Sequence, residues 1–229
     1  MPVSFGIGWY GALDGGVNVY QSYRDNRTFT LNDGLGTQVA IERQHKIGGF
    51  GGIKLGYVFG TGAVRFAVEE SIFYNGFQSS LRAQAFTPQG VAIGGPANSN
   101  LTVNSVPFMT NFLVRFAPGN QRFQPYIGLG IGGYYASTGN ISVNVRGAQY
   151  TINRSASNGS FAWNVLAGAD YYFNPKLSMF LEYTYLNYNN LGGKTVTVGN
   201  GVITGTNSHF FGNQNLGQSL IGAGVRFHF

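Results

Sequence analysis

Few side chains in this sequence have the types and the spacing that catalysis or metal binding requires. Cysteine is absent, and His45, His209 and His228 are not spaced as metal ligands. Ser208 and His209 suggest a nucleophile and its base, but adjacent side chains on an extended chain point in opposite directions. No carboxylate follows Glu182 to orient the imidazole. We therefore predict that the protein is not an enzyme and has no metal site and no cofactor.

Two glycine-rich runs, GGFGG and GLGIGG, resemble phosphate-binding loops. That kind of site needs a helix N-terminus directly after the loop, and no helical pattern follows either run. The basic residues are scattered and lack the aromatic platform of single-strand nucleic-acid binders. We predict no nucleic-acid partner.

Charged residues give a clearer signal, because they recur at positions that face away from apolar side chains. Their neighbours on that polar side are small, and the set holds four charges of each sign. Balanced charges that are crowded together should neutralise one another, whereas a buried ion left alone costs several kcal/mol. We predict an interior charge network formed by Asp14, Lys54, Arg65, Glu69, Arg115, Asp170, Glu182 and Arg226. Within it we expect two ion pairs, Lys54–Glu69 and Glu182–Arg226.

The elements that position these charges are strands, because apolar and polar residues alternate with a period of two. Glu69 and Glu70 interrupt the alternation, so we predict a β-bulge there; without one, Glu70 would face outward. Interior glycines should leave room for long side chains. We predict eight strands, over residues 5–20, 47–59, 64–74, 106–116, 123–135, 161–173, 177–187 and 218–229.

The connections alternate between short and long. Tight turns occupy residues 60–62, 118–122 and 174–176, whereas the long loops run through 23–46, 77–104, 137–158 and 190–215. This segregation is typical of an even-stranded up-and-down barrel. Alternating patches flank turn dipeptides within the loops and predict hairpins at Asp33-Gly34, Arg146-Gly147 and Asn200-Gly201.

Composition decides which face of the barrel meets water. Charged residues make up 10% of the 229 residues and aromatics 15%, which is too little charge for an ordinary soluble surface. The apolar face has aromatic residues at its ends, including Phe5, and matches a lipid-facing band. In hydrocarbon only helices and closed barrels satisfy every backbone group, and no apolar run reaches the ~18 residues of a spanning helix. We predict a single all-β domain over 1–229, an eight-stranded antiparallel up-and-down transmembrane β-barrel.

Specific segments carry a family resemblance. The C-terminal GAGVRFHF, with Gly224, Phe227 and Phe229, resembles the assembly signal of bacterial outer-membrane proteins. FQPYIGLGIGGYY, LEYTYLNY and this terminus together resemble the OmpA/OmpX-like opacity-protein superfamily of eight-stranded barrels. The resemblance implies location in the bacterial outer membrane, insertion by the barrel-assembly machinery, and contact with outer-membrane lipid and lipopolysaccharide. The chain starts without a signal-peptide pattern, so we expect that segment to be missing from it.

The long loops carry eight basic residues against Asp25, Asp33 and Glu42, a net charge of +5. We call the eight the basic rim: Arg24, Arg27, Arg43, Lys46, Arg82, Arg146, Arg154 and Lys194. The rim would attract lipopolysaccharide phosphates or host polyanions and matrix. We therefore expect a monomer with a structural or adhesin-like surface role. The alternatives are a narrow channel for small solutes or ions and, because small barrels include such enzymes, a lipid A acylhydrolase that uses His209.

Overall fold

The computed structural model describes residues 5–20, 27–30, 36–45, 47–117, 122–138, 141–145, 148–152, 158–189 and 215–229. None of these residues forms a helix long and apolar enough to cross a membrane. The strands are β1 (Gly8–Tyr20), β2 (Arg27–Thr30), β3 (Gln38–His45), β4 (Gly48–Phe59), β5 (Val64–Phe86), β6 (Ala92–Phe116), β7 (Phe123–Thr138), β8 (Ile141–Val145), β9 (Ala148–Ile152), β10 (Asn158–Asn174), β11 (Leu177–Tyr188) and β12 (Leu216–His228).

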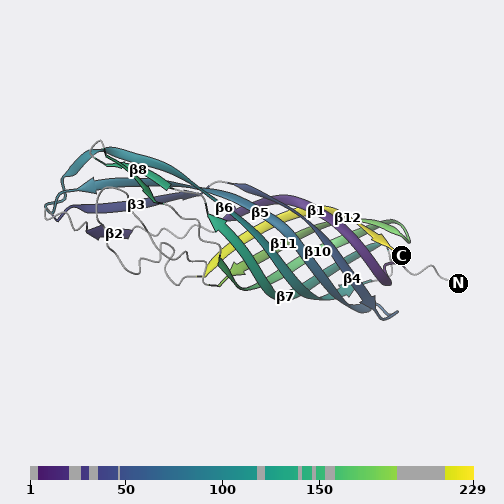
Figure 1. The fold of residues 1–229 in the computed structure, drawn as a ribbon. Helices are drawn as coiled ribbons and strands as arrows, with labels where there is room; N and C mark the ends of the chain where they lie inside the picture. The colour runs from purple at the N-terminus through teal and green to yellow at the C-terminus, as the bar shows by residue number, and fades with distance from the viewer. Residues whose placement is uncertain are drawn as a thin grey trace.

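Eight of these strands close into an antiparallel barrel (Figure 1). Going round the barrel, their order is β1, β4, β5, β6, β7, β10, β11 and β12. β12 then pairs with β1 from Tyr10–His228 to Tyr20–Gln218, which leaves no free edge. The eight-stranded up-and-down barrel predicted from the sequence is confirmed.

β5 and β6 are longer than the sequence indicated, because the predicted loop 77–104 is mostly strand. The two strands stay paired outside the barrel, and a short turn in which Thr87 N donates to Val91 O at 2.8 Å joins them. Polar residues fill much of this stretch, so it lacks the alternation that marks a strand with one buried face. The hydrogen bonds between the two strands join backbone groups and need no particular side chains, so the strands form without that pattern.

β3 pairs with the outer part of β5, and β2 pairs with β3. We call β2, β3 and the parts of β5 and β6 beyond the barrel the outer sheet. Figure 1 shows it continuing the barrel wall on the side away from the chain termini. β8 and β9 pair separately, and β8 contacts β6. The strands on either side of the predicted turns at Asp33-Gly34 and Arg146-Gly147 are therefore paired, whereas these dipeptides lie outside the described residues. The segment with Asn200-Gly201 lies outside the described residues.

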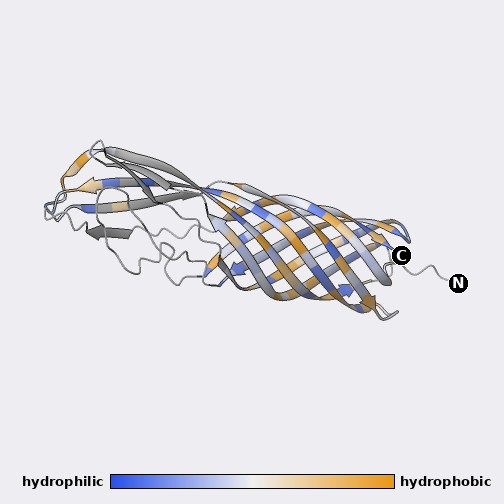
Figure 2. Ribbon diagram, in the orientation of Figure 1, coloured by the Kyte–Doolittle hydropathy of each residue, from blue (hydrophilic) through white to orange (hydrophobic). Residues whose placement is uncertain are grey.

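The large apolar side chains point outward. Leu13, Ile53, Phe66, Leu129 and Leu181 are each more than half exposed, and orange and blue residues alternate along the barrel strands in Figure 2. The predicted orientation, with apolar residues outside and polar residues inside, is therefore correct along these strands.

Phe5 departs from the prediction that it lies on the outer apolar face. β1 begins at Gly8, and the residues before it turn into the mouth of the barrel at the short-turn end. There the carbonyl of Phe5 accepts hydrogen bonds from Arg65 and from Gln124, and its ring lies 5.8 Å from that of Tyr172. The hydrogen bonds from Arg65 and Gln124 explain why this segment lies inside the mouth of the barrel and not on its outer face.

The predicted bulge at Glu69 and Glu70 is wrong. β5 keeps a continuous register against β4 and β6 across both residues, and its irregularity falls between Ala83 and Ala85 in the outer sheet. Glu69 is therefore buried inside, and Glu70 is exposed on the outer face, the alternative outcome. The hydroxyl of Thr110 donates to both Glu70 carboxylate oxygens, at 2.9 and 3.0 Å.

Interior glycines make room for tyrosine rings. A Cβ added at Gly56 would collide with the ring of Tyr10, and one added at Gly168 would lie 2.6 Å from Tyr126 Cζ and 2.6 Å from the Leu181 carbonyl oxygen. Both tyrosines cross the lumen to reach carboxylates, as described below. Glycine at these two sites is therefore a packing requirement of the interior.

Gly168→Ala should lower the free energy of unfolding by about 1–3 kcal/mol, because the methyl group overpacks the interior against backbone as well as ring. Urea unfolding in detergent micelles, followed by tryptophan fluorescence, measures this change. Gly51→Ala is the matched control, since its added Cβ meets its nearest atom at 3.6 Å. Equal stability of the two variants would contradict this account of the interior glycines.

Candidate functional site: the charged interior

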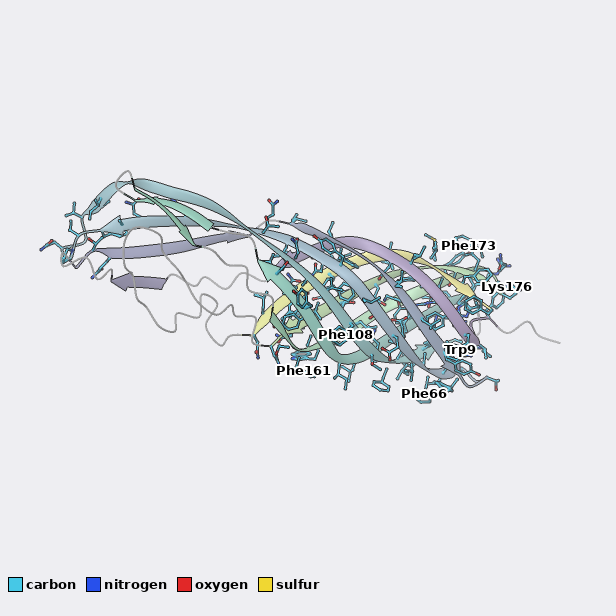
Figure 3. The ribbon with its side chains drawn as sticks, in the orientation of Figure 1. Trp9, Phe66, Phe108, Phe161, Phe173 and Lys176 are labelled. Carbon is cyan, nitrogen blue, oxygen red and sulfur yellow. The ribbon has the colours of Figure 1, made fainter. Side chains whose placement is uncertain are left out.

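The charged interior contains all eight residues of the predicted network, on seven of the barrel strands. Arg65, Arg115 and Arg226 are at most 2% exposed, and the other five are also largely enclosed. The inward side chains lie within the wall of the barrel drawn in Figure 3. The barrel therefore has a polar, side-chain-filled centre.

Lys54 is the centre of the acidic half of this interior. Its Nζ lies 2.6 Å from Glu182 Oε1, 3.4 Å from Glu69 Oε1 and 3.6 Å from Asp14 Oδ2. One ammonium group thus faces three carboxylates, which come from three other strands. Low-dielectric surroundings strengthen this attraction and also make any unpaired member costly.

Asp170 is the centre of the basic half, which lies nearer the short turns. Its carboxylate accepts hydrogen bonds from Arg115 Nη2 and from Arg226 Nη1. Arg226 Nη2 also lies 3.3 Å from Glu69 Oε2, so Glu69 links the two halves. Seven of the eight charges form one connected cluster.

Arg65 is the second residue of β5 and lies at the end of the interior nearest the short turns. It pairs across strands with Arg115, so two like charges lie directly opposite each other. Its guanidinium donates to the carbonyls of Phe5 and Gly62, the latter at 3.2 Å. These bonds hold the residues before β1 in the mouth of the barrel.

Of the two predicted ion pairs, Lys54–Glu69 is present. Glu182 and Arg226 do not pair, because the β11–β12 register places Arg226 opposite Ser178, four residues along β12 from Gly222, which lies opposite Glu182. Arg226 therefore reaches Asp170 and Glu69, while Glu182 reaches Lys54.

Aromatic residues complete the network, and the sequence analysis assigned them no such role. Tyr10 donates to Glu69 Oε2 and Tyr126 to Glu182 Oε2, both at 2.8 Å. The guanidinium carbon of Arg226 lies 4.6 Å from the ring centroids of both Tyr10 and Phe180. The alternation of the strands places these tyrosines on the inward face, and that position could have predicted their contact with the charges.

A neutral polar layer lies on the loop side of the ions. Asn75 donates to Gln218 Oε1 at 2.6 Å and to Tyr188 OH at 2.8 Å, and it also accepts a hydrogen bond from Asn18. Buried apolar residues such as Val103 and Leu186 pack around Tyr188. Side chains therefore occupy the interior well beyond the charged network.

The remaining predicted residues lie elsewhere. Phe227 and Phe229 are exposed on the outer face, Phe229 N donates to Trp9 O at 3.1 Å, and Gly224 lies against the Phe180 ring. In the basic rim, Arg82 is exposed on the outer sheet, and Arg27 and Arg43 lie on β2 and β3. The rest of the rim lies outside the described residues: Arg24, Lys46, Arg146, Arg154 and Lys194.

The candidate catalytic residues do not converge in the described part of the chain. His228 is buried, with Nε2 3.1 Å from Tyr172 OH, and His45 lies on β3. Ser208 and His209 lie outside the described residues. No group of three or more possible metal ligands occurs among the residues that the structure describes.

The structure is thus a closed eight-stranded barrel with apolar residues outside and ions inside. A comparison with known protein families agrees with this architecture. The family model for the outer membrane protein beta-barrel domain matches residues 8–229. The chain belongs to this family. No curated relative matches the sequence. Outer-membrane barrels of this family are bacterial, and the resemblance seen in the sequence is confirmed.

Solved structures of outer-membrane barrels are similar in fold. Neisserial surface protein A (NspA) is 19% identical with a TM-score of 0.47, each chain being covered to 97%. OprG from Pseudomonas aeruginosa is 15% identical with a TM-score of 0.44 and 99% of each chain covered. The outer-membrane protease OmpT from Escherichia coli is 8% identical with a TM-score of 0.52 and 97% of each chain covered. At 8% identity the likeness to OmpT concerns the fold alone and says nothing about activity.

Lys54→Met should lower the free energy of unfolding of this outer-membrane barrel by about 3–5 kcal/mol, because it removes the cation beside the buried carboxylates of Asp14 and Glu182 and leaves Glu69 with Arg226 alone. Urea titration in micelles measures the loss. Lys176→Met is the matched control, since Lys176 is exposed in the turn between β10 and β11, and it should change stability by less than about 0.5 kcal/mol. Equal effects of the two substitutions would show that the network does not stabilise the barrel.

Proposed function

We propose that this protein is a non-conducting anchor in the bacterial outer membrane that presents the outer sheet and its basic rim for binding to polyanions at the cell surface. The observation that carries the proposal is the division of the molecule into two parts. The barrel interior is filled with buried side chains, and the β5–β6 hairpin continues beyond it into the outer sheet.

The filled interior supports an anchoring role over transport. Lys54 and Glu182 approach from different strands to 2.6 Å, and Arg115, Arg226 and Asp170 have no exposed surface. Ions that are bonded to one another across the lumen leave no continuous aqueous path at their level. An eight-stranded barrel is also at the size at which side chains fill the interior.

The charge of the loops supports the choice of partner. The eight basic residues of the rim and the three loop carboxylates sum to a net charge of +5. Of the rim, Arg82 is exposed on β5 of the outer sheet, in register with Glu42 of β3 and Asn98 of β6. A basic surface away from the membrane core attracts phosphates or sulfates at long range. Lipopolysaccharide phosphates and sulfated host polysaccharides share this chemistry.

A shortened hairpin tests the surface role. Joining Gln78 to Thr102 by an Asn-Gly turn removes the outer parts of β5 and β6 and keeps the register that holds the barrel. The purified variant should keep its heat-dependent shift in gel migration and lose binding to heparin and to lipopolysaccharide. Binding equal to that of the intact chain would reject the proposed role of the outer sheet.

Arg82→Gln should weaken heparin binding about two- to fivefold at low salt, the size expected for one exposed ionic contact. Lys176→Gln, at the opposite end of the barrel, is the matched control and should leave the affinity unchanged. Equal weakening by both substitutions would indicate attraction to overall charge and not to the outer sheet.

The narrow channel is the second candidate, and the charged and amide side chains inside the barrel favour it. Planar-bilayer recording distinguishes the two functions. The anchor predicts no steady conductance from the intact protein. A steady conductance that changes in Glu69→Gln would reject the anchor and support the channel.

A further inference from the structure

Within the apolar outer face of the barrel, Glu70 is the one charged side chain in the described part of the chain. On β5 it lies four residues after Phe66 and four before Tyr74, two exposed aromatic residues near the two borders of the lipid-facing band. At about 3.3 Å per residue and a strand tilt near 40°, each of them lies about 10 Å from Glu70 in depth. Glu70 is therefore near the middle of the hydrocarbon layer.

The neighbours of Glu70 on this surface are apolar. Leu55 of β4 lies in register with it, and Ile72 is the next outward residue on β5. Phe108 and Phe112 of β6 are each 55% exposed on the same side of the barrel. Hydrocarbon solvates a carboxyl group poorly, so an ionisable side chain in this layer usually marks a contact or a functional site.

Thr110 supplies only part of what the Glu70 carboxyl group requires. It lies opposite Glu70 on β6, with its hydroxyl oxygen 2.9 and 3.0 Å from the two carboxyl oxygens. That hydroxyl has a single hydrogen, so it donates fully to one oxygen at a time. Within the described part of the chain, the carboxyl group has no other hydrogen-bond partner. The second oxygen therefore needs a polar partner from outside the barrel.

We propose that this surface of β5 and β6 is the contact between two copies of the chain in the membrane, with Glu70 and Thr110 at its centre. Both copies span the membrane in the same direction, so each places Glu70 at the same depth. A two-fold axis along the membrane normal brings the two carboxyl groups together. Adjacent carboxyl groups share a hydrogen, so each becomes the polar partner of the other, while Thr110 in each copy continues to donate to Glu70.

The position of the polar pair explains why the occupant is a second copy. Apolar side chains gain little by exchanging lipid for one another, so a contact within the membrane depends on polar groups and close packing. A second copy necessarily carries a carboxyl group and a hydroxyl group at this depth. Phe108 and Phe112 on each copy pack around the pair and exclude lipid from it. The proposal replaces the monomer expected from the sequence.

Cross-linking in phosphatidylcholine vesicles tests the contact, and the absence of cysteine from the chain allows single cysteines to be introduced. Ile72→Cys places a thiol beside Glu70, and Leu181→Cys places one on the outer face of β11, on the opposite side of the barrel. After oxidation with copper phenanthroline, Ile72→Cys should give at least about fivefold more disulfide-linked dimer than Leu181→Cys. Equal yields would overturn the proposal.

Glu70→Leu, combined with Ile72→Cys, tests whether the polar pair holds the two copies together. The yield of dimer should fall to that of Leu181→Cys. Ser219→Leu is the matched control, because it removes an outward hydroxyl on β12 that lies 3.0 Å from Tyr183 OH, and it should leave the yield of Ile72→Cys unchanged. An undiminished yield with Glu70→Leu would overturn the proposal.

If Glu70→Leu does not fold, the comparison of Ile72→Cys with Leu181→Cys decides alone, because both variants keep Glu70. Neither result depends on whether the outer sheet binds polyanions.

Discussion

The contact between Lys54 and three carboxylates is the interaction on which the rest of this structure depends. A barrel with an apolar exterior places its polar side chains inside, where little water is available to solvate them. Four carboxylates in that space are tolerable only if cations from other strands reach them. Pairs such as Lys54–Glu182 and Arg226–Glu69 therefore also join strands that are distant in sequence, and the neutralisation of charge and the closure of the barrel support each other.

Space inside the barrel follows from the same constraint. Tyr10 and Tyr126 reach across the lumen where the facing residue is glycine, Gly56 opposite Tyr10 and Gly168 opposite Tyr126. Two of the 36 glycines of the chain thus meet a packing requirement of the interior. Charged residues, tyrosines and glycines thus form one packing solution.

Alternation along the strands was enough to predict the barrel, its eight strands and the inward direction of the charges, because a period of two is a local property. Pairing inside the lumen was less accessible, since the partner of Arg226 depends on the β11–β12 register and on the tilt of each strand. The bulge predicted at Glu70 failed because the structure keeps the register and accepts an outward carboxylate bonded to Thr110. The outer parts of β5 and β6 were predicted as a loop, because their polar residues give no alternation. Phe5 was predicted on the outer face, whereas hydrogen bonds from Arg65 and Gln124 hold its backbone inside.

The division between a filled barrel and a projecting sheet separates stability from interaction. The ion pairs join residues of the barrel strands and none of the outer sheet in the described part of the chain, so we expect substitutions in the outer sheet to leave the barrel closed. The direct test of the central claim is a double-mutant cycle between Lys54 and Glu182, using Lys54→Met, Glu182→Gln and the combined variant. We predict a coupling energy of at least about 1.5 kcal/mol in the free energy of unfolding. Additive effects, within about 0.5 kcal/mol, would contradict the claim that these ions stabilise the barrel by neutralising each other.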